Sequence, residues 1–248
     1  MKLLGKIILI TGAAKRIGRE IALQLAKGGA SIVIHYRESK ASALQLQQEI
    51  MKIGAQSYIV QADFSGRGPI SPIIEKFLSQ VYRFVPQIDV LVNNAAIFYP
   101  TPFGKIAEKD WDTFLNVNLK APFFLAQAVG REMLKKKSGK IINLVDWMGD
   151  RPAARFLPYS ISKAGLIAAT KGLAKNLAPH VQVLGIAPGP ILPAAHSSPQ
   201  EQQQAAAKTL LYRFGEPKDI AETVRFLIEG TDFMTGSIVY TDGGASLA

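Results

Sequence analysis

The sequence predicts a single α/β domain over residues 1–248, with a doubly wound parallel sheet of about seven strands and helices on both of its faces. Short, continuous apolar runs alternate along the chain with segments whose apolar residues recur every third or fourth position. Continuous apolar runs are typical of strands that are buried on both sides in a parallel sheet. No linker divides the chain, and it shows no internal repeat.

The first strand is expected at residues 6–11, because this stretch is apolar and a small-residue turn follows it. Ile17, Ile21 and Leu25 then share one face of a helix that ends at Gly28-Gly29. The same reasoning predicts strands at 31–34, 57–60, 88–92, 140–145, 181–187 and 237–240, and helices at 40–53, 73–84, 107–137, 158–177, 200–212 and 218–229.

The composition excludes several classes of protein. A hydrophobic fraction of 48% and a charged fraction of 19% are those of a globular chain. The absence of cysteine excludes disulfides, thiolate zinc sites and a cysteine nucleophile. The three histidines, His35, His180 and His196, do not have the spacing of metal ligands.

The sequence also bears on location and charge. No apolar run approaches the length of a membrane span, and the apolar run near the start is too short for a signal peptide, so a cytoplasmic protein is expected. With 29 Lys and Arg against 19 Asp and Glu, the net charge is +10, which favours an anionic ligand or a nucleic acid as partner.

Ligands of doubly wound sheets bind beyond the carboxyl ends of the strands, so the residues there are the first candidates for a site. After the first strand, Gly12 permits a tight turn and Gly18 permits close helix packing, while free N–H groups at the helix start face an anion. The usual middle glycine of such a motif is replaced by Arg16. An ordinary strand–turn–helix unit has a similar pattern, so this motif alone does not decide the function.

Arg37 follows the second strand, where it favours a 2′-phosphate and therefore NADPH over NADH. Lys15 and Arg16 lie on the neighbouring loop, so three cations are expected to converge on one phosphate-rich ligand. Glu38 either binds a ribose or caps the next helix. A solvated basic surface is the alternative interpretation of the three cations.

Polar residues follow the third and fourth strands as well. Asp63 is placed either to accept from an adenine amino group or to cap a helix. Asn93 and Asn94 offer paired amides beside the ligand. Asn118 lies inside an apolar helix, where a buried amide needs a partner, and a structural hydrogen bond is the simpler explanation.

The fifth strand is followed by Asp146, and then by Tyr159 and Lys163, which are four positions apart and share a helix face. We expect the nearby ammonium to lower the pKa of the phenol toward the range of a general acid. Tyr and Lys at this spacing also occur as ordinary surface pairs. Their place just after the fifth strand of a nucleotide-binding sheet favours catalysis.

Over essentially its full length the chain resembles the short-chain dehydrogenase/reductase family. The matching segments are Thr11 to Gly18, Asp63, Asn93-Asn94-Ala95, Asn118, Tyr159 to Lys163, Pro188-Gly189, Thr235-Gly236 and Asp242-Gly243-Gly244. The resemblance implies a Rossmann fold, hydride transfer with a nicotinamide cofactor, and a proton relay of Asn118, Tyr159 and Lys163. Family members usually have Ser where Asp146 stands and Gly where Arg16 stands.

Within that family the chain resembles the pteridine reductases. The shared features are the Thr-Gly-Ala-Ala-Lys-Arg loop at 11–16, His35-Tyr36 at a strand end, Asp146, the segment Asn93 to Pro102 and the ending Thr235 to Leu247. The resemblance implies that Phe98 stacks a flat pterin over the nicotinamide and that Arg16 reaches the ligand. Ala96 replaces a serine that is frequent in this subgroup.

Together these arguments assign catalysis to Asp146, Tyr159, Lys163 and Asn118, and substrate binding to Arg16, Phe98, Asp146, Tyr159 and Leu192. NADPH is expected at Gly12, Lys15, Arg16, Ile17, Gly18, His35, Tyr36, Arg37, Ser39, Asp63, Phe64, Asn94, Ala95, Tyr159, Lys163, Pro188 and Gly189. A Pro- and Gln-rich loop at about 189–208 is expected to cover the substrate. The resemblance further implies a homotetramer, with the helices near 107–137 and 158–177 at one interface.

Three functions remain open from the sequence. The first is an NADPH-dependent reductase of a C=N bond in a dihydropterin or dihydrofolate-like ring, because an ionised Asp146 would repel the alkoxide of a reduced ketone. The second is a carbonyl reductase such as a 3-oxoacyl-acyl-carrier-protein reductase, whose acidic carrier would suit a charge of +10. The third is a nucleotide-sensing or nucleic-acid-binding module without catalysis, against which the intact Tyr159 and Lys163 pair argues.

Overall fold

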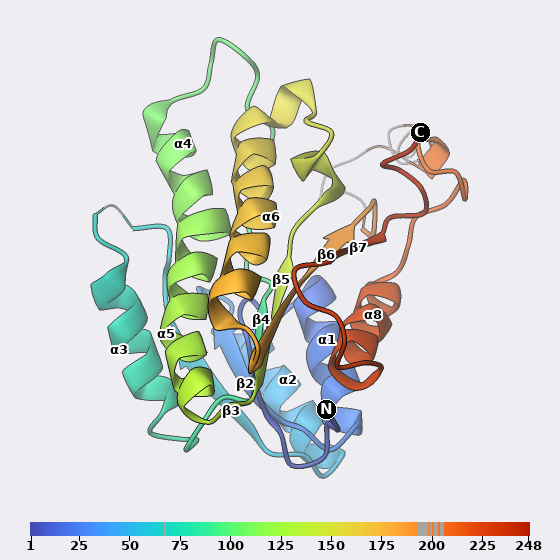
Figure 1. Cartoon of the computed structure of the whole chain (residues 1–248). Helices are drawn as coiled ribbons and strands as arrows, with labels where there is room; N and C mark the ends of the chain where they lie inside the picture. Colours follow the sequence, from blue (N-terminus) through green and yellow to red (C-terminus); the bar gives the residue numbers. More distant parts are fainter. Residues whose placement is uncertain (67, 193–197, 199, 201–202, 204–205) are drawn as a thin grey trace.

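Seven strands lie parallel in one sheet, in the order β3-β2-β1-β4-β5-β6-β7, in the part of the chain that the computed structural model describes (Figure 1). That part is the whole chain except residues 67, 193–197, 199, 201–202 and 204–205. The strands are β1 (Ile7–Ile10), β2 (Ser31–Tyr36), β3 (Ser57–Gln61), β4 (Val90–Asn93), β5 (Gly139–Leu144), β6 (Val181–Pro188) and β7 (Ile238–Thr241). The predicted doubly wound α/β fold is confirmed.

Helices cover both faces of the sheet (Figure 1). One face carries α1 (Arg16–Lys27), α2 (Lys40–Lys52) and α8 (Pro217–Glu229), whose apolar residues share a core with the strands. The other face carries α3 (Ser71–Val81), α5 (Ala121–Lys135) and α6 (Leu157–Leu177), which form a second core. The helix α4 (Glu108–Leu115) leads into α5 on this second face.

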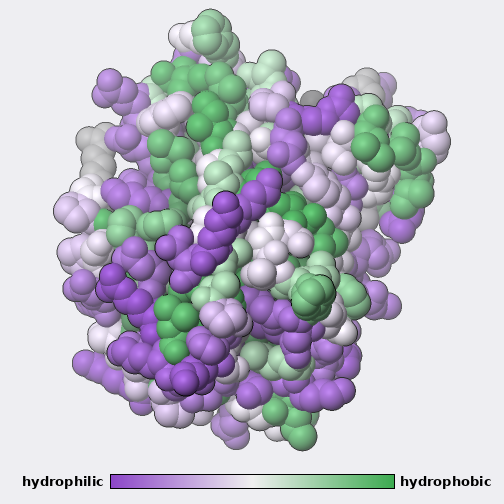
Figure 2. Space-filling model, viewed as in Figure 1, coloured by the Kyte–Doolittle hydropathy of each residue, from purple (hydrophilic) through white to green (hydrophobic). Residues whose placement is uncertain are grey.

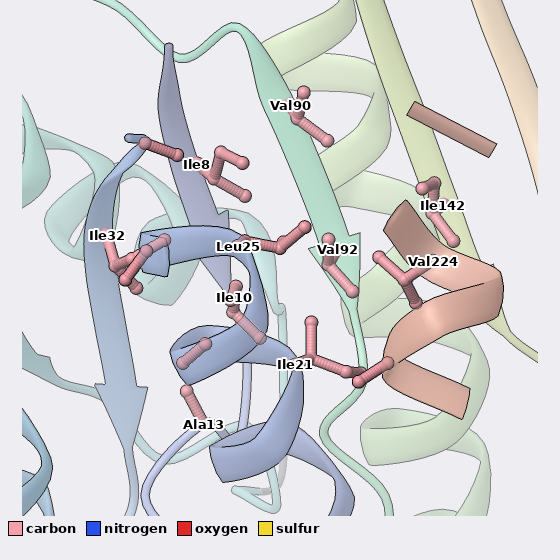
Figure 3. Close-up of a cluster of buried hydrophobic side chains, with 14 of the residues drawn as sticks. Ile8, Ile10, Ala13, Ile21, Leu25, Ile32, Val90, Val92, Ile142 and Val224 are labelled. Atoms are coloured by element: carbon pink, nitrogen blue, oxygen red, sulfur yellow. The ribbon is translucent and has the colours of Figure 1, made fainter. Parts of the chain in front are cut away.

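The apolar runs are continuous because successive strand residues enter opposite cores. In β1, Ile8 and Ile10 point into the core beneath α1 and α8, whereas Leu9 belongs to the core on the other face. Figure 3 shows Ile8 and Ile10 in the first of these cores, beside Ile21 of α1 and Val224 of α8. All three β1 residues are fully buried, so they contribute to stability and not to ligand binding.

The sheet order reverses at β1, which pairs with β2 on one side and with β4 on the other. The chain reaches β3 at one edge of the sheet and then returns to the centre at β4. A reversal of this kind leaves a crevice beyond the carboxyl ends of the two central strands, and ligands of open α/β sheets bind there. The turns after β1 and β4 are therefore where a site is to be sought.

The long helix expected at 107–137 contains one irregular turn. Residues Asn116–Lys120 form a π-helix between α4 and α5, so one wider turn interrupts an otherwise continuous α-helix. Such turns are uncommon and gather at functional sites. The irregular turn contains Asn118, which the sequence assigns to catalysis.

The helix expected at 200–212 is in part wrong and in part lies outside the described residues. Residues 208–213 form turns and bends, in which Tyr212 has a φ of +53°. The hydroxyl of Thr209 accepts a hydrogen bond from the N–H of Arg213 at 3.2 Å. A side chain that binds nearby main-chain groups in this way competes with helical hydrogen bonds.

Hydrophilic residues cover most of the face shown in Figure 2, with apolar ones gathered toward its upper part. Among the described residues, no helix has the length and apolar character needed to cross a membrane. A cavity of about 760 Å³ lies beside α8 and β7, and its lining residues, which include Ile191, Phe226 and Tyr240, do not belong to the site predicted from sequence.

Candidate active site

The turn after β1 is tied to the turn after β4 by Thr11 and Asn94. The hydroxyl of Thr11 accepts from the N–H groups of Asn94 and Ala95 at 2.9 and 3.0 Å. The Asn94 amide donates in return to the carbonyls of Thr11 and Gly12 at 2.8 and 3.0 Å. These four bonds hold both sides of the crevice in one arrangement before any ligand binds.

Glycine is required at two positions of this turn. Gly12 has a φ of +63°, and a Cβ there would lie 2.9 Å from the Cα of Ala95. A Cβ on Gly18 would lie 2.4 Å from the carbonyl oxygen of Gly12 and 2.5 Å from the Asn94 amide nitrogen. No side chain fits at such distances, so the glycines let α1 start directly against the crevice.

Arg16 occupies the position at which a middle glycine is usual, and its φ of +54° explains that preference. This left-handed conformation costs about 1 kcal/mol for a residue with a Cβ, so Arg16 is kept at an energetic cost. The start of α1 at Arg16 has no side-chain cap. Uncapped N–H groups at a helix start, beside two exposed cations, fit the phosphates of a dinucleotide.

The three cations expected at the rim of the crevice are present, and Arg37 has an ion-pair partner. Lys15 and Arg16 are exposed at the start of α1. Arg37, just after β2, forms an ion pair with Glu38 at 3.1 Å. The side chains of Arg37 and Glu38 are 45% and 75% exposed, so solvent weakens this pair and a phosphate can compete for the arginine.

Other residues predicted to bind the cofactor lie beneath the crevice. His35 is 3% exposed, Tyr36 is 7% exposed and Phe64 is 4% exposed, so their side chains belong to the protein interior. Ile17 packs against the core on the α1 face. Ser39 lies at the start of α2 without donating or accepting a capping bond there.

Asp63 stands just after β3, as expected, and is held by its own turn. Its Oδ1 accepts from the N–H and the hydroxyl of Ser65 at 2.8 and 2.6 Å. Partial burial raises the pKa of the carboxyl group, but these hydrogen bonds and the charge of Arg37 outweigh it and lower that pKa overall. Asp63 is therefore an ionised acceptor at the edge of the crevice.

Asp146 and Tyr159 meet on the other side of the crevice, after β5 and in the first turn of α6. The Tyr159 hydroxyl donates to Oδ2 of Asp146 at 2.7 Å, and Oδ1 of Asp146 accepts from the N–H of Met148 at 2.8 Å. The second bond caps a short 3-10 helix, Trp147–Gly149, which fixes the carboxylate. The structure thus brings together two side chains that the sequence predicts for one site.

The predicted lowering of the phenol pKa is wrong for this arrangement. Burial raises the pKa of Tyr159 well above its usual value, and the Asp146 charge and hydrogen bond add to that rise. The Asp146 carboxylate accepts a hydrogen bond from the phenolic hydroxyl, so it stabilises the protonated form of Tyr159. Burial also raises the pKa of Asp146, although its bonds with Met148 and Tyr159 oppose the rise.

Lys163 is 3% exposed and lies one helical turn beyond Tyr159. Its Nζ donates to the carbonyl of Leu144 at 2.6 Å and stands 5.7 Å from the centre of the Tyr159 ring. Burial lowers the pKa of Lys163 to about 8, while the charge of Asp146 acts in the opposite direction. The ammonium is therefore held at the end of β5, close to the Tyr159 ring.

Asn118 is fully buried in the π-helical turn and makes several hydrogen bonds. Its Oδ1 accepts from the N–H of Ile97 at 2.9 Å, and its amide donates to the carbonyl of Ile97 and to the hydroxyl of Ser162. The side chain thus connects the segment after β4 with α6. This is the structural hydrogen bonding that the sequence left open, and it places Asn118 beside the helix of Tyr159.

Phe98 lies beside Tyr159, and its side chain is 48% exposed. Its ring stacks on Phe156 with centroids 4.6 Å apart and an interplanar angle of 9°, and meets Tyr159 edge-on at 4.8 Å. A third ring does not fit between two rings at that separation. A flat substrate therefore needs either the other face of Phe98 or displacement of Phe156.

The end of β6 completes the site as far as it is described. Pro188 is buried, and a Cβ on Gly189 would lie 2.5 Å from the backbone of Asp242, so this chain segment runs close against the turn after β7. Leu192 packs against the core. The greater part of the expected substrate loop, 193–208, overlaps the residues outside the described part of the chain.

Sequence reasoning missed Thr11, Ser162 and Phe156 as parts of the site. Thr11 precedes the glycine turn, and its position at a strand end was the available signal. Ser162 donates to the carbonyl of Tyr159 and accepts from Asn118, which spacing alone does not reveal. Phe156 could be found only through its three-dimensional contact with Phe98.

Comparison with known proteins identifies the family of the chain. The family model described as short chain dehydrogenase matches residues 6–204. The 3-oxoacyl-acyl-carrier-protein reductases of Staphylococcus epidermidis and Aquifex aeolicus are 35% and 34% identical, over 97% and 98% of this chain and 99% and 98% of their own. That of Synechocystis is 35% identical over 98% of this chain and 97% of its own. The chain belongs to the short-chain dehydrogenase family of oxidoreductases.

Proposed function

We propose that the protein is an NADPH-dependent reductase of a C=N bond in a flat heterocycle of the dihydropterin or dihydrofolate type. The observation that carries the proposal is the partly buried Asp146 carboxylate, which accepts a hydrogen bond from the Tyr159 hydroxyl at 2.7 Å. In the family this position usually holds a serine, which can donate to a substrate carbonyl. A carboxylate at the reacting atoms selects a different substrate.

The charge that develops during reduction explains the selection. When a ketone gains hydride its oxygen becomes negative, and an ionised Asp146 beside it would raise the barrier. When a C=N bond gains hydride its nitrogen takes up a proton, and an adjacent carboxyl group that can hold a proton assists. Burial raises the pKa of Asp146, which brings its protonated form closer to neutral pH.

Tyr159, Asp146 and Lys163 then have distinct roles. Tyr159 supplies a proton to the substrate nitrogen and becomes a phenolate, while Asp146 orients the donor edge of the ring and relays a replacement proton from water to that phenolate. Lys163 tunes the phenol and holds the ribose of the nicotinamide. Asn118 keeps α6 against the segment after β4, and it completes the relay through water.

The other residues bind. The uncapped start of α1, with Lys15, Arg16 and Arg37, holds the phosphates, and a bound NADPH supplies the hydride. Phe98 forms the apolar wall of the substrate site. Arg16 and Leu192 contact the substrate, and the loop at about 189–208 covers it, within one domain that spans residues 1–248. We also propose a cytoplasmic homotetramer, on the family resemblance.

A second candidate is reduction of a 3-oxoacyl thioester on an acyl-carrier protein. It is favoured by the names of the relatives, which are 35% identical over 97% of this chain. A net charge of +10 would also attract an acidic carrier. Asp146 and the aromatic pair of Phe98 and Phe156 argue against it, because neither suits a linear 3-oxoacyl group.

Steady-state NADPH consumption with dihydrobiopterin, dihydrofolate and an acetoacetyl thioester tests the two candidates. We expect turnover of a dihydropterin or dihydrofolate, and a kcat/KM for the thioester lower by about two orders of magnitude. Asp146→Ser is the matched variant. It should reduce the difference in kcat/KM between the two substrate classes, because a serine favours the carbonyl substrate. Turnover of the thioester alone by the unmodified protein would refute the C=N proposal and establish the second candidate.

A further inference from the structure

His35 lies near the end of β2. Both of its ring nitrogens contact main-chain groups, one in the turn after β1 and one in the turn after β3. The N–H of Gly12 donates to its Nδ1 at 3.0 Å, and its Nε2 is 3.0 Å from the carbonyl of Ala62. The ring stacks on Phe64 with centroids 4.7 Å apart and meets Phe77 edge-on at 5.2 Å. Neither the glycine motif nor the catalytic residues account for a histidine in this place.

The two partners fix the protonation state of the ring. A main-chain N–H can only donate, so Nδ1 carries a lone pair, and a carbonyl can only accept, so Nε2 carries the proton. Protonation of Nδ1 would place two N–H groups against each other. Burial lowers the pKa of His35 to about 4, with the Ala62 bond and the charge of Asp63 opposing the fall. One neutral tautomer therefore persists across the physiological range.

The two contacts of His35 connect the turn after β1 with the turn after β3. These turns border the half of the crevice that lies over β1, β2 and β3. Gly12 is the turn at which phosphates are expected, and its carbonyl is already held by Asn94. Ala62 immediately precedes Asp63, the carboxylate at the far edge. Main-chain bonds run alongside: Ala13 N–H donates to the carbonyl of His35 at 3.0 Å, and Ala62 N–H to that of Tyr36 at 3.2 Å.

We propose that His35 is a positioning residue that sets the distance between the phosphate turn at Gly12 and the acidic edge at Asp63, and thereby preforms the adenosine half of the dinucleotide site. The inference rests on the proposed binding of NADPH at this crevice. His35 contacts no ligand itself, since its side chain is buried beneath the turn and both nitrogens are occupied.

His35→Phe separates positioning from packing. Phenylalanine keeps a ring against Phe64 and Phe77 but loses both hydrogen bonds. We expect the Kd of NADPH, measured by calorimetry without substrate, to rise about ten-fold, because the turn is no longer held and an N–H is left buried without a partner. At saturating NADPH, kcat should change by less than about two-fold, since Tyr159 and Lys163 are on α6 and do not contact His35.

Two further variants control the experiment. Phe77→Leu weakens the packing around the ring but leaves both hydrogen bonds, so it should lower the thermal midpoint while leaving the NADPH Kd within about two-fold. His35→Asn restores an acceptor near the position of Nδ1 and should recover part of the lost affinity. If His35→Phe folds poorly, His35→Gln, which keeps the reach toward Ala62 but not toward Gly12, carries the same comparison.

The outcomes separate the inference from the proposed function. An unchanged NADPH Kd in His35→Phe, or an equal loss in Phe77→Leu, would overturn the positioning role while NADPH binding stands. A protein that in its unmodified form binds neither NADPH nor NADH would overturn the proposed cofactor and the inference with it. A ring protonated at Nδ1 in long-range proton–nitrogen NMR spectra would also overturn it.

Discussion

The charged groups on the two sides of the crevice differ in their exposure to solvent. On the cofactor side, Arg37 and Glu38 form an exposed pair. On the substrate side, Lys163 is buried one helical turn beyond Tyr159 and Asp146 is partly buried where it accepts from the Tyr159 hydroxyl, and burial shifts the pKa of both charged groups. Water screens Arg37 and Glu38 until a bound ligand displaces that water. Asp146 and Lys163 are already desolvated before a ligand binds.

The difference separates recognition from chemistry. Exposed cations cost little stability and release their solvent only when a phosphate arrives, so they add affinity and selectivity. Buried charges interact strongly at all times, so they determine protonation states and rates. We therefore expect substitutions on the substrate side to change turnover by large factors, and substitutions at the cofactor rim to change binding by smaller ones.

Tyr159→Phe should produce the largest effect. It removes the hydroxyl that donates to Asp146 at 2.7 Å while keeping the ring beside Phe98. General acid catalysis is worth roughly 10²–10⁴-fold, so kcat should fall by that factor, while the NADPH Kd should change far less because the Tyr159 ring is kept. Steady-state rates and calorimetry measure the two quantities.

Tyr99→Phe is the matched control for this change. Tyr99 also donates to a carboxylate, that of Asp110 at 2.9 Å, but does not touch Asp146 or Lys163. Its kcat should remain within about two-fold of the unmodified protein. Equal losses in the two variants would mean that the phenol of Tyr159 has no special role, and the comparison between the two sides would fail.

Arg37→Asp tests the cofactor rim. A charge-assisted hydrogen bond to a 2′-phosphate is worth about 1.5–3 kcal/mol, so the Kd of NADPH should rise roughly 10- to 100-fold while that of NADH changes little. Arg131→Asp makes the same change of charge on an exposed part of α5, and both Kd values should stay the same there. A 2′-phosphate bound elsewhere would leave the preference for NADPH intact in Arg37→Asp.

The contrast also marks what sequence reasoning could reach. The sheet, the crevice and the positions of Gly12, Asp146 and Tyr159 follow from periodicity and from the rule that ligands bind at strand ends. The direction of the Tyr159 pKa does not follow, because it depends on whether Lys163 or Asp146 faces the phenol. Spacing along a helix places side chains on one face, but only three-dimensional contacts show which atoms meet.

The pH dependence of turnover tests the buried set. Lys163, with a pKa of about 8, loses its charge as the pH rises through that value, so kcat/KM should fall on the alkaline side near pH 8. The Asp146 charge raises the Lys163 pKa, so Asp146→Asn should lower it further and move the alkaline limb to lower pH, by on the order of one unit. The kcat/KM of Asp146→Asn and of the unmodified protein, measured across the pH range, gives the shift of the alkaline limb.

Asp110→Asn provides the control for that shift. Asp110 accepts from Tyr99 and makes no contact with Lys163 in the described part of the chain, so the alkaline limb of Asp110→Asn should stay near pH 8. If Asp146→Asn moved the limb to higher pH, or not at all, the carboxylate would not act on Lys163. The limb would then report another group.

Glu38→Gln should give the smallest effect, and it decides between the two roles that the sequence leaves open for this residue. The exposed pair with Arg37 is worth no more than about 0.2–1 kcal/mol, so its removal should tighten NADPH only about two- to three-fold, by freeing the arginine and removing a charge that repels the 2′-phosphate. The gain should shrink at high salt, because the pair is exposed. If instead the affinity for NADH falls, Glu38 binds the ribose, and the cofactor rim contributes directed hydrogen bonds as well as charge.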